Sequence, residues 1–562
     1  MPDISKINAL DIGSVSKVDG LAKASILDIN GVTVPSAFTG LLDTYTGAAA
    51  GYSTRRLATS ATNLMRIRED SGDTETDIGY DSNNELDTAA IASHCGTANG
   101  FVVSWVDQSS NSNDADQSTT TAQPKIYDGT TQAVITENGK PIITSSSNAY
   151  MQTAYDGNAI FFSVAQPLDG SILGQYDLTS GGGSNSNGWL YMAEAAYGGG
   201  AFGSDITINS ARKNGSAYST TGADADQIYT DFNGQNLLYT SLSTASQNLN
   251  FGYRPGPGVF PMWSMQEFII YPDTSTHTPS DIEDNINSEY LIYQPTDAPT
   301  SGLLATYTGA AAAYSVRQLS DKAVLALRIR RDSDDVEQNF GFDTNGDLDT
   351  AGIASFCGTA NGYVTRWWDQ STNGNHSDQA TDASQPQIYN GTAVITENGK
   401  PAARFDGTND FIKNDAAVTQ ATTFVMVNTW PAQDGDTHIM MDGINFTGGR
   451  QGFAMDSDLG VRLFADSGVY GTDPMTAGDQ TLSTGIFNGT SSTLRLNGSA
   501  VSGISAGTQG ADGQTLGAGV NGGLPSDMDL QEFILWDSDQ STPTDNRTGI
   551  ETDVNTYFSI YT

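Results

Sequence analysis

Basic residues are scarce in this sequence. The 25 Lys and Arg residues stand against 65 Asp and Glu residues, for a formal net charge of −40 at pH 7. A surface of this sign repels the phosphate backbone of nucleic acids and the anionic headgroups of lipids. We therefore expect neither a nucleic-acid partner nor a membrane partner.

Long apolar segments are also lacking. The sequence has no run of about 18 apolar residues, so it predicts no membrane-spanning helix. The first residues, Met1 to Lys6, do not combine a basic start with an apolar core, so we expect no Sec signal peptide. If the protein acts outside a cell, assembly into a particle released by lysis is one route out.

Cysteine occurs only twice, as Cys95 and Cys357. The two lie at equivalent places in the repeat described next, and a disulfide would bring the α carbons of two separate domains within about 7 Å. We expect two buried free thiols instead.

The sequence contains a long internal repeat. The segment from Leu41 to Ala50 returns with one change from Leu303 to Ala312, and the offset of 262 positions holds without a gap for about eighty residues. Solenoid repeats have periods of roughly 20–50 residues, so this is a duplicated domain. We place an N-terminal arm at residues 1–36, domains at 37–293 and 301–562, and a linker at 294–300.

Composition and patterning favour an all-β fold for each copy. The chain is rich in Gly, Ser, Thr, Asn and Asp, and short apolar runs such as residues 161–165 and 423–427 are bounded by polar clusters. We expect hairpin turns at Asn233-Gly234 and Asn497-Gly498. Each copy then ends in one short amphipathic helix, which we expect Ser280 and Asp545 to cap; the apolar faces comprise Ile282, Ile286 and Tyr290, and Ile550, Val554 and Phe558.

The arm has a small period of its own. A β-branched residue followed by Asn or Asp and a small residue recurs at Ile7-Asn8-Ala9, Val18-Asp19-Gly20 and Ile29-Asn30-Gly31, which indicates three tight turns. A segment of this length cannot bury a core. We expect it to dock on another chain, because a floppy tail would not explain the spacing.

Two acidic segments place oxygen ligands at alternate positions, as calcium loops do. The glutamate that closes such a loop is missing from both. We favour an acidic turn that caps the following Thr-Ala segment, with a calcium site as the alternative. The candidate ligands are Asp81, Asn83, Glu85 and Asp87 in the first copy and Asp343, Asn345, Asp347 and Asp349 in the second.

A Trp/Asp/Gln motif in each copy places a carboxylate, Asp107 or Asp369, beside an aromatic strand end. The carboxylate could hold a loop or a sugar hydroxyl. We favour a buried ion pair instead, between Asp107 and Arg66 or Arg68, and between Asp369 and Arg328 or Arg330. His376 has Asp114 as its counterpart, so histidine chemistry is not shared by the copies.

The second copy resembles the sandwich catalytic domain of glycoside hydrolase family 54 α-L-arabinofuranosidases. The resemblance rests on Leu325-Ala-Leu-Arg-Ile-Arg-Arg-Asp332, Phe356-Cys357, Trp368-Asp-Gln-Ser-Thr-Asn-Gly-Asn-His376 and Gln385-Pro386. It implies two tandem concanavalin-like or laminin-G-like jelly-roll sandwiches. The family's disulfide partner of the Phe-Cys cysteine is replaced by Gly100 and Gly362, which fits folding in a reducing cytoplasm.

The resemblance does not carry the activity over. The family's nucleophile is a Glu in a Met-Glu-Ala strand, whose nearest match is Glu194, with Asp456 or Asp458 as its counterpart. The segments that match the family's acid, Gly252–Pro255 and Gly517–Val520, hold no carboxylate. Because hydrolysis needs two carboxylates, we expect no enzyme; a retaining glycosidase acting on host polysaccharide is the alternative.

The arm resembles repeats that open many phage head and tail surface proteins, and the sandwiches resemble carbohydrate-recognising modules. Together these resemblances imply a non-enzymatic, homo-oligomeric bacteriophage surface protein, made in the host cytoplasm, whose arm binds other virion proteins. It would be a head decoration or fibre, or a tail fibre, attaching to host glycans. The candidate glycan contacts are Trp189, Tyr191, Tyr253 and Trp263, where the second copy has Phe453, Met455 and Gly519 nearby.

Overall fold

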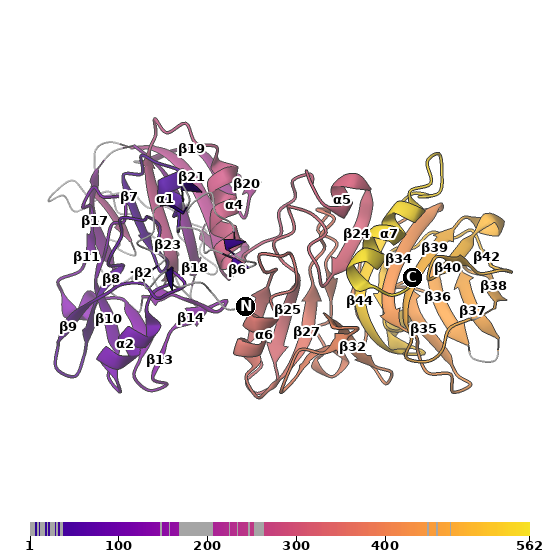
Figure 1. The fold of residues 1–562 in the computed structure, drawn as a ribbon. Helices are drawn as coiled ribbons and strands as arrows, with labels where there is room; N and C mark the ends of the chain where they lie inside the picture. Colours follow the sequence, from indigo (N-terminus) through magenta and orange to yellow (C-terminus); the bar gives the residue numbers. More distant parts are fainter. Residues whose placement is uncertain are drawn as a thin grey trace. The chain divides into compact units, whose positions relative to one another are not determined.

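The computed structural model forms two compact units, Met1–Asn285 and Ile286–Thr562, and strands dominate both (Figure 1). Both are all-β sandwiches. The domain limits expected at residues 36, 293 and 300 remain predictions. The structure describes residues 38–145, 149–156, 158–167, 206–223, 225–232, 234–244, 248–251, 263–446, 449–456, 459–472 and 474–562, together with six short strands before residue 38.

The six short strands pair as three hairpins within the arm. The register places Ile7 opposite Leu10, Val18 opposite Leu21 and Ile29 opposite Val32, so each pair of strands flanks the two residues at which the sequence predicts a turn. The strands are β1 (Lys6–Ile7), β2 (Leu10–Asp11), β3 (Lys17–Val18), β4 (Leu21–Ala22), β5 (Asp28–Ile29) and β6 (Val32–Thr33).

The first sandwich is built on one large sheet. Its strands run in the spatial order β20, β19, β21, β18, β23, β16, β12, β10, with β8 and β9 beyond β10. The elements are α1 (Leu41–Thr44), β7 (Ala50–Ser53), β8 (Met65–Glu69), β9 (Glu75–Ile78), α2 (Thr88–Cys95), β10 (Gly100–Trp105), β11 (Ala115–Asp116), η3 (Thr120–Ala122), β12 (Lys125–Asp128), β13 (Ala133–Val134), β14 (Thr136–Glu137), β15 (Lys140–Pro141), β16 (Ile143–Thr144), β17 (Met151–Asp156), β18 (Ala159–Pro167), β19 (Ile206–Lys213), β20 (Ser216–Ala217), α3 (Ala225–Asp231), β21 (Asn236–Thr244), β22 (Asn248–Phe251), β23 (Trp263–Pro272) and α4 (Pro279–Tyr290).

The strands of the second sandwich form two facing sheets, which β28 joins because it pairs with β27 in one and with β33 in the other; β24 pairs with β44 in the first. One runs β26, β25, β27, β29, β32, β44, β34, β39, β40, β41, and the other β33, β43, β35, β36, β37, β38. The elements are α5 (Leu303–Thr306), β24 (Ala310–Ser315), β25 (Leu327–Arg331), β26 (Glu337–Phe340), α6 (Thr350–Cys357), β27 (Asn361–Trp367), β28 (Ser377–Asp378), η4 (Asp382–Ser384), β29 (Gln387–Asn390), β30 (Thr396–Glu397), β31 (Lys400–Pro401), β32 (Ala403–Asp406), β33 (Ile412–Asn414), β34 (Thr422–Thr429), β35 (Thr437–Asp442), β36 (Gly452–Asp456), β37 (Gly460–Phe464), β38 (Gly468–Gly471), β39 (Gln480–Phe487), η5 (Gly489–Ser491), β40 (Thr493–Leu496), β41 (Ser499–Ala500), β42 (Ser505–Ala506), β43 (Gln514–Leu516), η6 (Val520–Gly522), β44 (Asp527–Trp536) and α7 (Arg547–Phe558).

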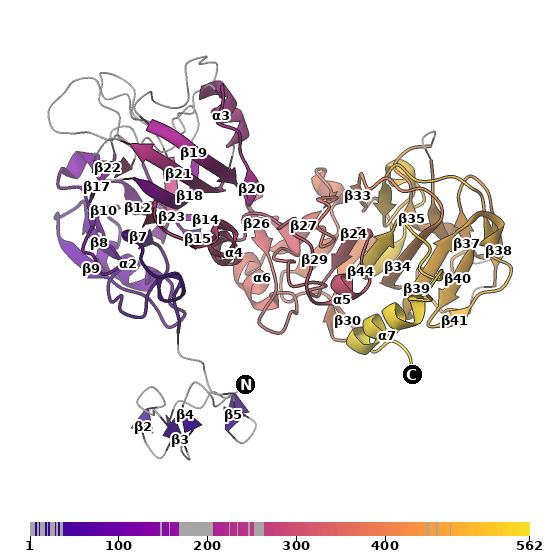
Figure 2. The same cartoon turned by 90° about the horizontal axis from the view of Figure 1, so that it is seen from above.

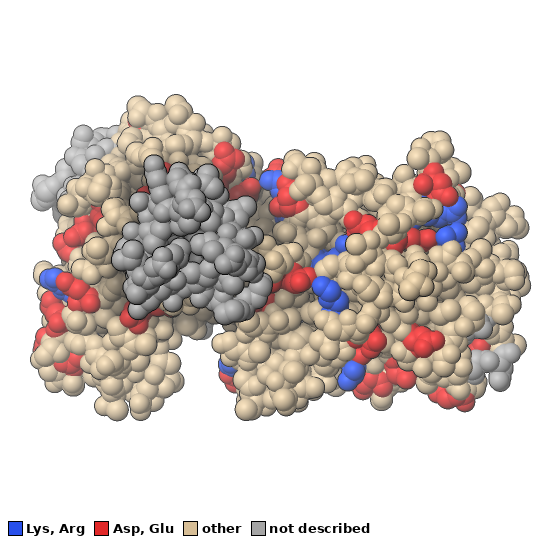
Figure 3. Space-filling model, in the orientation of Figure 1, with Lys and Arg blue, Asp and Glu red and all other residues tan. Residues whose placement is uncertain are grey.

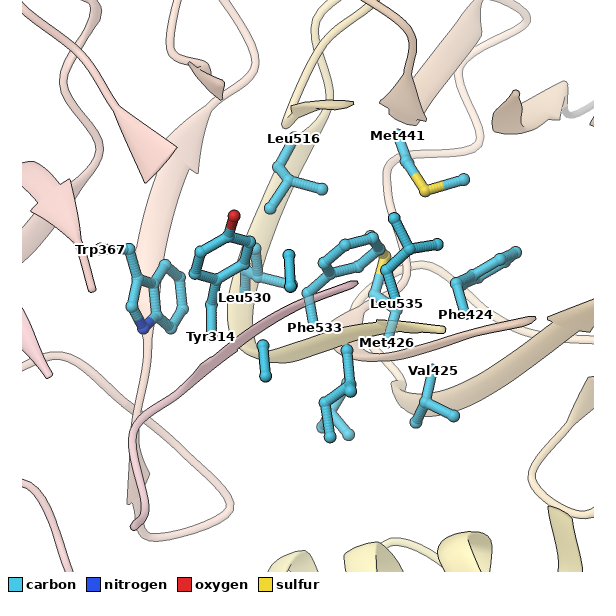
Figure 4. Packing of buried hydrophobic residues seen from close by; sticks show 14 of the residues in the cluster. Tyr314, Trp367, Phe424, Val425, Met426, Met441, Leu516, Leu530, Phe533 and Leu535 are labelled. Carbon is cyan, nitrogen blue, oxygen red and sulfur yellow. The ribbon is translucent and has the colours of Figure 1, made fainter. Parts of the chain in front are cut away.

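Aromatic side chains fill the space between these two sheets. Tyr314, Phe533 and Phe424 come from three adjacent strands, and Leu516 and Met441 approach them from the facing sheet (Figure 4). The rings of Tyr314 and Phe533 stack with centroids 6.2 Å apart. Packing of this kind, with many contacts per side chain, gives a sandwich most of its stability.

Helix α7 covers the outer face of the first of these sheets, beside β39 (Figure 2). Its predicted apolar face is buried, as is that of α4 in the first copy. The predicted caps need correction. Helix α4 begins at Pro279 rather than at Asp281, and Asp545 accepts the amide N–H of Arg547 from one residue before the N-cap of α7.

The two copies place an equivalent edge hairpin by different chain connections. In the first copy β19 and β20 precede β21, whereas in the second β40 and β41 follow β39, yet each hairpin extends the same edge of the sheet. Arg212 binds Glu283 of α4 at 2.7 Å, and Arg495 binds Glu551 of α7 at 2.9 Å. The same side-chain anchor therefore fixes both hairpins.

This difference corrects one of the two predicted turns. Asn497-Gly498 joins β40 to β41 with both residues at positive φ, which confirms the predicted hairpin. Its counterpart is Asn214-Gly215, between β19 and β20. The prediction at Asn233-Gly234 was wrong, because Gly234 lies between helix α3 and strand β21; Asn233 is outside the described residues.

The prediction of two buried free thiols is confirmed. Cys95 and Cys357 are buried and unbridged. Burial raises the pKa of each thiol to about 11, so both stay protonated. Within the described residues, none of the helices has the length and apolar character needed to cross a bilayer. Acidic side chains are spread over the face drawn in Figure 3, with fewer basic ones among them.

Candidate functional site

The carboxylates of the Trp/Asp/Gln motifs hold loops. Asp369 Oδ1 accepts hydrogen bonds from the amide N–H groups of Ala313 and Ser371, both at 2.8 Å. Its Oδ2 accepts hydrogen bonds from the Ser371 hydroxyl and from the amide N–H of Asn375. Asp107 makes the equivalent contacts in the first sandwich. The motif therefore fastens its own loop to the neighbouring strand, β7 or β24.

The ion pairs predicted for these carboxylates were wrong. Arg66 pairs with Asp77, which lies opposite it on β9, at 2.7 Å. Arg328 likewise donates to Asn339 at 2.8 Å on the neighbouring strand. Arg68 binds Asp73, and Arg330 binds Asp335. Each arginine thus takes a partner on or next to its adjacent strand, while the motif carboxylates are already occupied by backbone amides.

The two acidic segments are turns that cap helices. Asp87 accepts the amide N–H of Ala90 at 2.9 Å, and Asp349 accepts that of Gly352 at 2.8 Å, so each caps the helix that follows, α2 or α6. Asp81 and Asp343 each accept two amide N–H groups of their own turn. This confirms the favoured interpretation. The described residues hold no group of three or more His, Cys, Asp or Glu placed to bind a metal ion.

A buried ion pair does occur in each sandwich, at residues that the sequence analysis did not connect. Glu532, in the middle of β44, is fully buried and accepts two hydrogen bonds from Arg317, the shorter at 2.8 Å. The first sandwich repeats the pair with Glu267 and Arg55. The sequence feature that could have revealed this ion pair is a glutamate within an otherwise apolar strand in both copies.

The predicted glycan contacts can be tested at one position. Trp263 on β23 is 0% exposed and belongs to the core, so it was wrongly predicted as a sugar platform. It begins a strand that is buried on both faces. Trp189, Tyr191 and Tyr253 lie outside the described residues, as does Glu194. In the second copy Phe453 and Met455 are likewise buried in the core.

Asp456, one of the two counterparts considered for Glu194, has a structural role. Its carboxylate accepts the Thr437 hydroxyl at 2.7 Å and the Leu459 amide at 3.0 Å, and the residue is 9% exposed. Asp458 lies outside the described residues.

The second sandwich carries a groove formed by two adjoining hollows that share Arg404 and Asp406. The first hollow, about 500 Å³, is bordered by Arg330, Tyr363 and Asp410. The second, about 540 Å³, extends over the start of β44 and is bordered by Glu397 and Asp529. We call these two hollows the carboxylate groove.

Arg404 and Asp529 lie at the centre of the carboxylate groove. They form a two-pronged ion pair with N–O distances of 2.8 and 2.7 Å. The Arg404 side chain is 51% exposed, whereas that of Asp529 is 9% exposed. The pair offers guanidinium N–H donors to solvent in a fixed plane, a geometry suited to the hydroxyl groups of a ligand.

Asp410 is a nearly buried acid at the edge of the groove. It is only 7% exposed, and its Oδ2 accepts the amide N–H of Asp406 at 3.1 Å, which is its one hydrogen bond with the described residues. Burial, and then the negative charge of Asp406, raise the pKa of Asp410 to about 7. A carboxyl group whose pKa is raised this far, and which borders a hollow, is unusual for a purely structural side chain.

The described residues of the first sandwich do not repeat the charged side chains of this groove. Strand register places Thr144 where the second copy has Arg404, and Ser264 where it has Asp529. Gln117 donates to the carbonyl oxygen of Tyr150, and its counterpart Gln379 donates to that of Phe411. Ala149 and Asp410, each one residue earlier, therefore occupy equivalent positions. Because one copy folds without these charges, the shared fold does not need them.

The first sandwich has a different hollow, of about 550 Å³, bordered by Arg66, Asp77 and Ser104. The second copy carries Arg366 where Ser104 stands, and that guanidinium lies over the ring of Trp368. The two copies have therefore diverged in their surfaces while keeping the same buried anchors.

Replacing Asp410 with asparagine should raise the melting temperature at pH 8 and leave it unchanged at pH 4. The folded protein holds the Asp410 proton up to about pH 7, whereas the unfolded chain loses it near the ordinary value of 3.8. Wild-type stability therefore falls as the pH rises through this window, and asparagine removes that loss. Thermal unfolding at both pH values measures it. Asp406→Asn should shrink the difference, and an equal effect at pH 4 and pH 8 would contradict the assignment.

The sequence matches no protein-family model and is similar to no curated protein at a significant level. Among solved structures, an arabinofuranosidase complexed with arabinofuranosyl-α-1,2-xylobiose aligns with 16% identity and a TM-score of 0.34, over 44% of this chain and 62% of that one. A GH54 α-L-arabinofuranosidase soaked with a cyclic sulfate inhibitor aligns with 15% identity and a TM-score of 0.35, over 44% of this chain and 62% of that one. The carbohydrate-binding module CBM66 from Bacillus subtilis aligns with 14% identity and a TM-score of 0.18, over 25% of this chain and 86% of that one. The chain thus spans less than two thirds of the two arabinofuranosidases.

Proposed function

We propose that the chain is a non-enzymatic attachment protein whose second sandwich binds a glycan in the carboxylate groove. The observation that carries the proposal is the presence of Arg404, Asp529 and Asp410 in one copy only. The combination of a fixed guanidinium, several carboxylates and the half-buried ring of Tyr363 offers donors, acceptors and an apolar contact to a sugar.

A glycan array probed with the full chain tests this proposal. We expect binding that is lost in the double variant Arg404→Ala/Asp529→Ala, which removes both charges of the pair together. Arg366→Ala/Asp378→Ala is the matched control, because it removes an ion pair of similar length, 2.6 Å, elsewhere in the same sandwich. An array without any binder would overturn the proposal, as would equal losses in the two variants.

For the whole chain, the proposed setting is the surface of a bacteriophage particle, as a head decoration or fibre or as a tail fibre. The arm would bind other virion proteins by main-chain pairing, and the sandwiches would face outward as part of a homo-oligomer. The three hairpins of the arm support this role, since strands of two residues cannot form a stable sheet alone.

Removing residues 1–36 should abolish incorporation into particles while leaving a soluble, folded protein. The two sandwiches have their own cores, so the truncated chain should keep its melting temperature within about 2 °C. Particles purified after infection in the presence of each form, and probed with antibody against the second sandwich, provide the measurement. If the shortened chain still joins particles, the arm is not the anchor.

A glycosidase is the second candidate, and Asp410 is the observation that favours it. A carboxyl group with a pKa near 7 has the property expected of a general acid, and further acidic side chains lie in the same groove. Release of reducing sugar from arabinan and host capsule distinguishes the two functions. Release by wild type that is lost in Asp410→Asn or in Glu194→Gln would make the chain an enzyme; no release from either substrate keeps it a binding protein.

A further inference from the structure

We propose that the carboxylate groove recognises a sugar bearing a free, positively charged amine beside its hydroxyl groups. This inference rests on the proposed glycan-binding function and adds the chemical class of the ligand. It follows from the charges that border the groove and from the environment of Asp410.

The two arginines of the groove are already neutralised. Arg404 is paired with Asp529, and Arg330 donates to Gln385 and Asp335. The carboxylates that remain include Asp406, and Glu397 in the second hollow. An anionic sugar entering the groove would meet these negative charges without a free cation to offset them, so uronic and sialic acids are disfavoured.

Asp410 supplies a specific partner for an amine. The residue is more than nine-tenths buried and borders the first hollow, and within the described part of the chain only the amide N–H of Asp406 donates to it, at one of its two oxygens. An ammonium group placed in the hollow would complete its hydrogen bonding and pair its charge. A neutral hydroxyl would satisfy the oxygen but would leave the carboxyl group protonated near neutral pH.

Charged and titratable groups from several elements border the hollow together with Asp410, and of these Asp406 is the one whose charge raises the pKa of Asp410. These groups are Asp406 on β32, Tyr363 on β27, Arg330 on β25, and Asp332 and Asp382 from the adjoining loop and η4. A bound cation favours the ionised form of Asp410 over the protonated form. Binding of an amino sugar below pH 7 should therefore release a proton from this residue.

Titration calorimetry of the full chain tests the inference, with an oligosaccharide of glucosamine and its N-acetylated counterpart as probes. At pH 5.5 the amine and Asp410 both carry their protons, so comparison of two buffers with different ionisation heats measures proton release directly. We expect the free amine to bind about tenfold more tightly than the acetylated sugar and to release about one proton per site. Asp410→Asn should abolish the release and most of the preference.

The outcomes separate this inference from the proposed function. Equal binding of both sugars, or tighter binding of the acetylated one, would overturn the amine specificity and leave glycan binding intact. Binding of neither sugar, together with an array that contains no binder, would overturn both. Calcium chloride titrated alone should give no heat; a metal that binds and is lost in Asp410→Asn would make the groove a cation site instead. Circular dichroism of each variant confirms that it is folded.

Discussion

Replacing Glu532 with alanine should lower the free energy of unfolding of the second sandwich by about 3–5 kcal/mol. The change leaves the Arg317 guanidinium, whose side chain is only 10% exposed, without its main partner. Breaking one side of a buried pair costs more than the pair contributes, because the remaining charge stays out of water. Urea unfolding of the full chain measures the shift. Asp553, at 2.7 Å from Arg317, compensates only in part because it is itself 43% exposed.

Two further variants show whether the loss of stability comes from the unpaired charge of Arg317. Glu267→Ala makes the same change in the first sandwich, so it should shift the other unfolding transition by a similar amount. Glu532→Gln combined with Arg317→Met removes both charges and should recover much of the stability. A loss below about 1 kcal/mol for Glu532→Ala would mean that water reaches the arginine.

Replacing Asp369 with alanine should cost about 3 kcal/mol or more. Three backbone amide groups, those of Ala313, Ser371 and Asn375, and one hydroxyl group lose their acceptor. Buried donors left without a partner cost about 1–3 kcal/mol each, and some of these will find water at the loop. Asp369→Asn keeps one acceptor oxygen, so about half of the loss should remain. Chemical unfolding of both variants measures the series.

The same series in the first sandwich is the control. Asp107 binds Gly51, Ser109 and Asn113 with the same geometry, so Asp107→Ala should be as costly in its own unfolding transition. Hydrogen exchange at Ala313 gives a local reading, because its amide should exchange faster once Asp369 is gone. Unchanged protection at that amide would show that another group has replaced the carboxylate.

Features that depend on neighbouring residues could be predicted from the sequence. The duplication, the all-β class, the buried thiols, the capping aspartates Asp87 and Asp349 and the Asn497-Gly498 turn all follow from local patterns. In each case the residues that interact lie within a few positions of one another, or the pattern repeats along the chain.

Features that depend on strand register could not be predicted in this way. Arg317 meets Glu532 across 215 residues, and Arg404 meets Asp529 only because β32 pairs with β44 in one particular register. The error at Asp107 has a related cause. The sequence pattern favours a nearby arginine as the partner of Asp107. In the structure Arg66 pairs with Asp77 on the opposite strand, and amide N–H groups of the loop donate to Asp107.

The edge hairpins show that position in the sheet and order along the chain are separable. One hairpin enters before its neighbouring strand and the other enters after it, yet each is held by an arginine that reaches the closing helix. Residue-by-residue correspondence between the copies is therefore interrupted at this hairpin, and it resumes at β23 and β44. The place of each hairpin at this edge is therefore set by its strand pairing and by its arginine, rather than by its order along the chain.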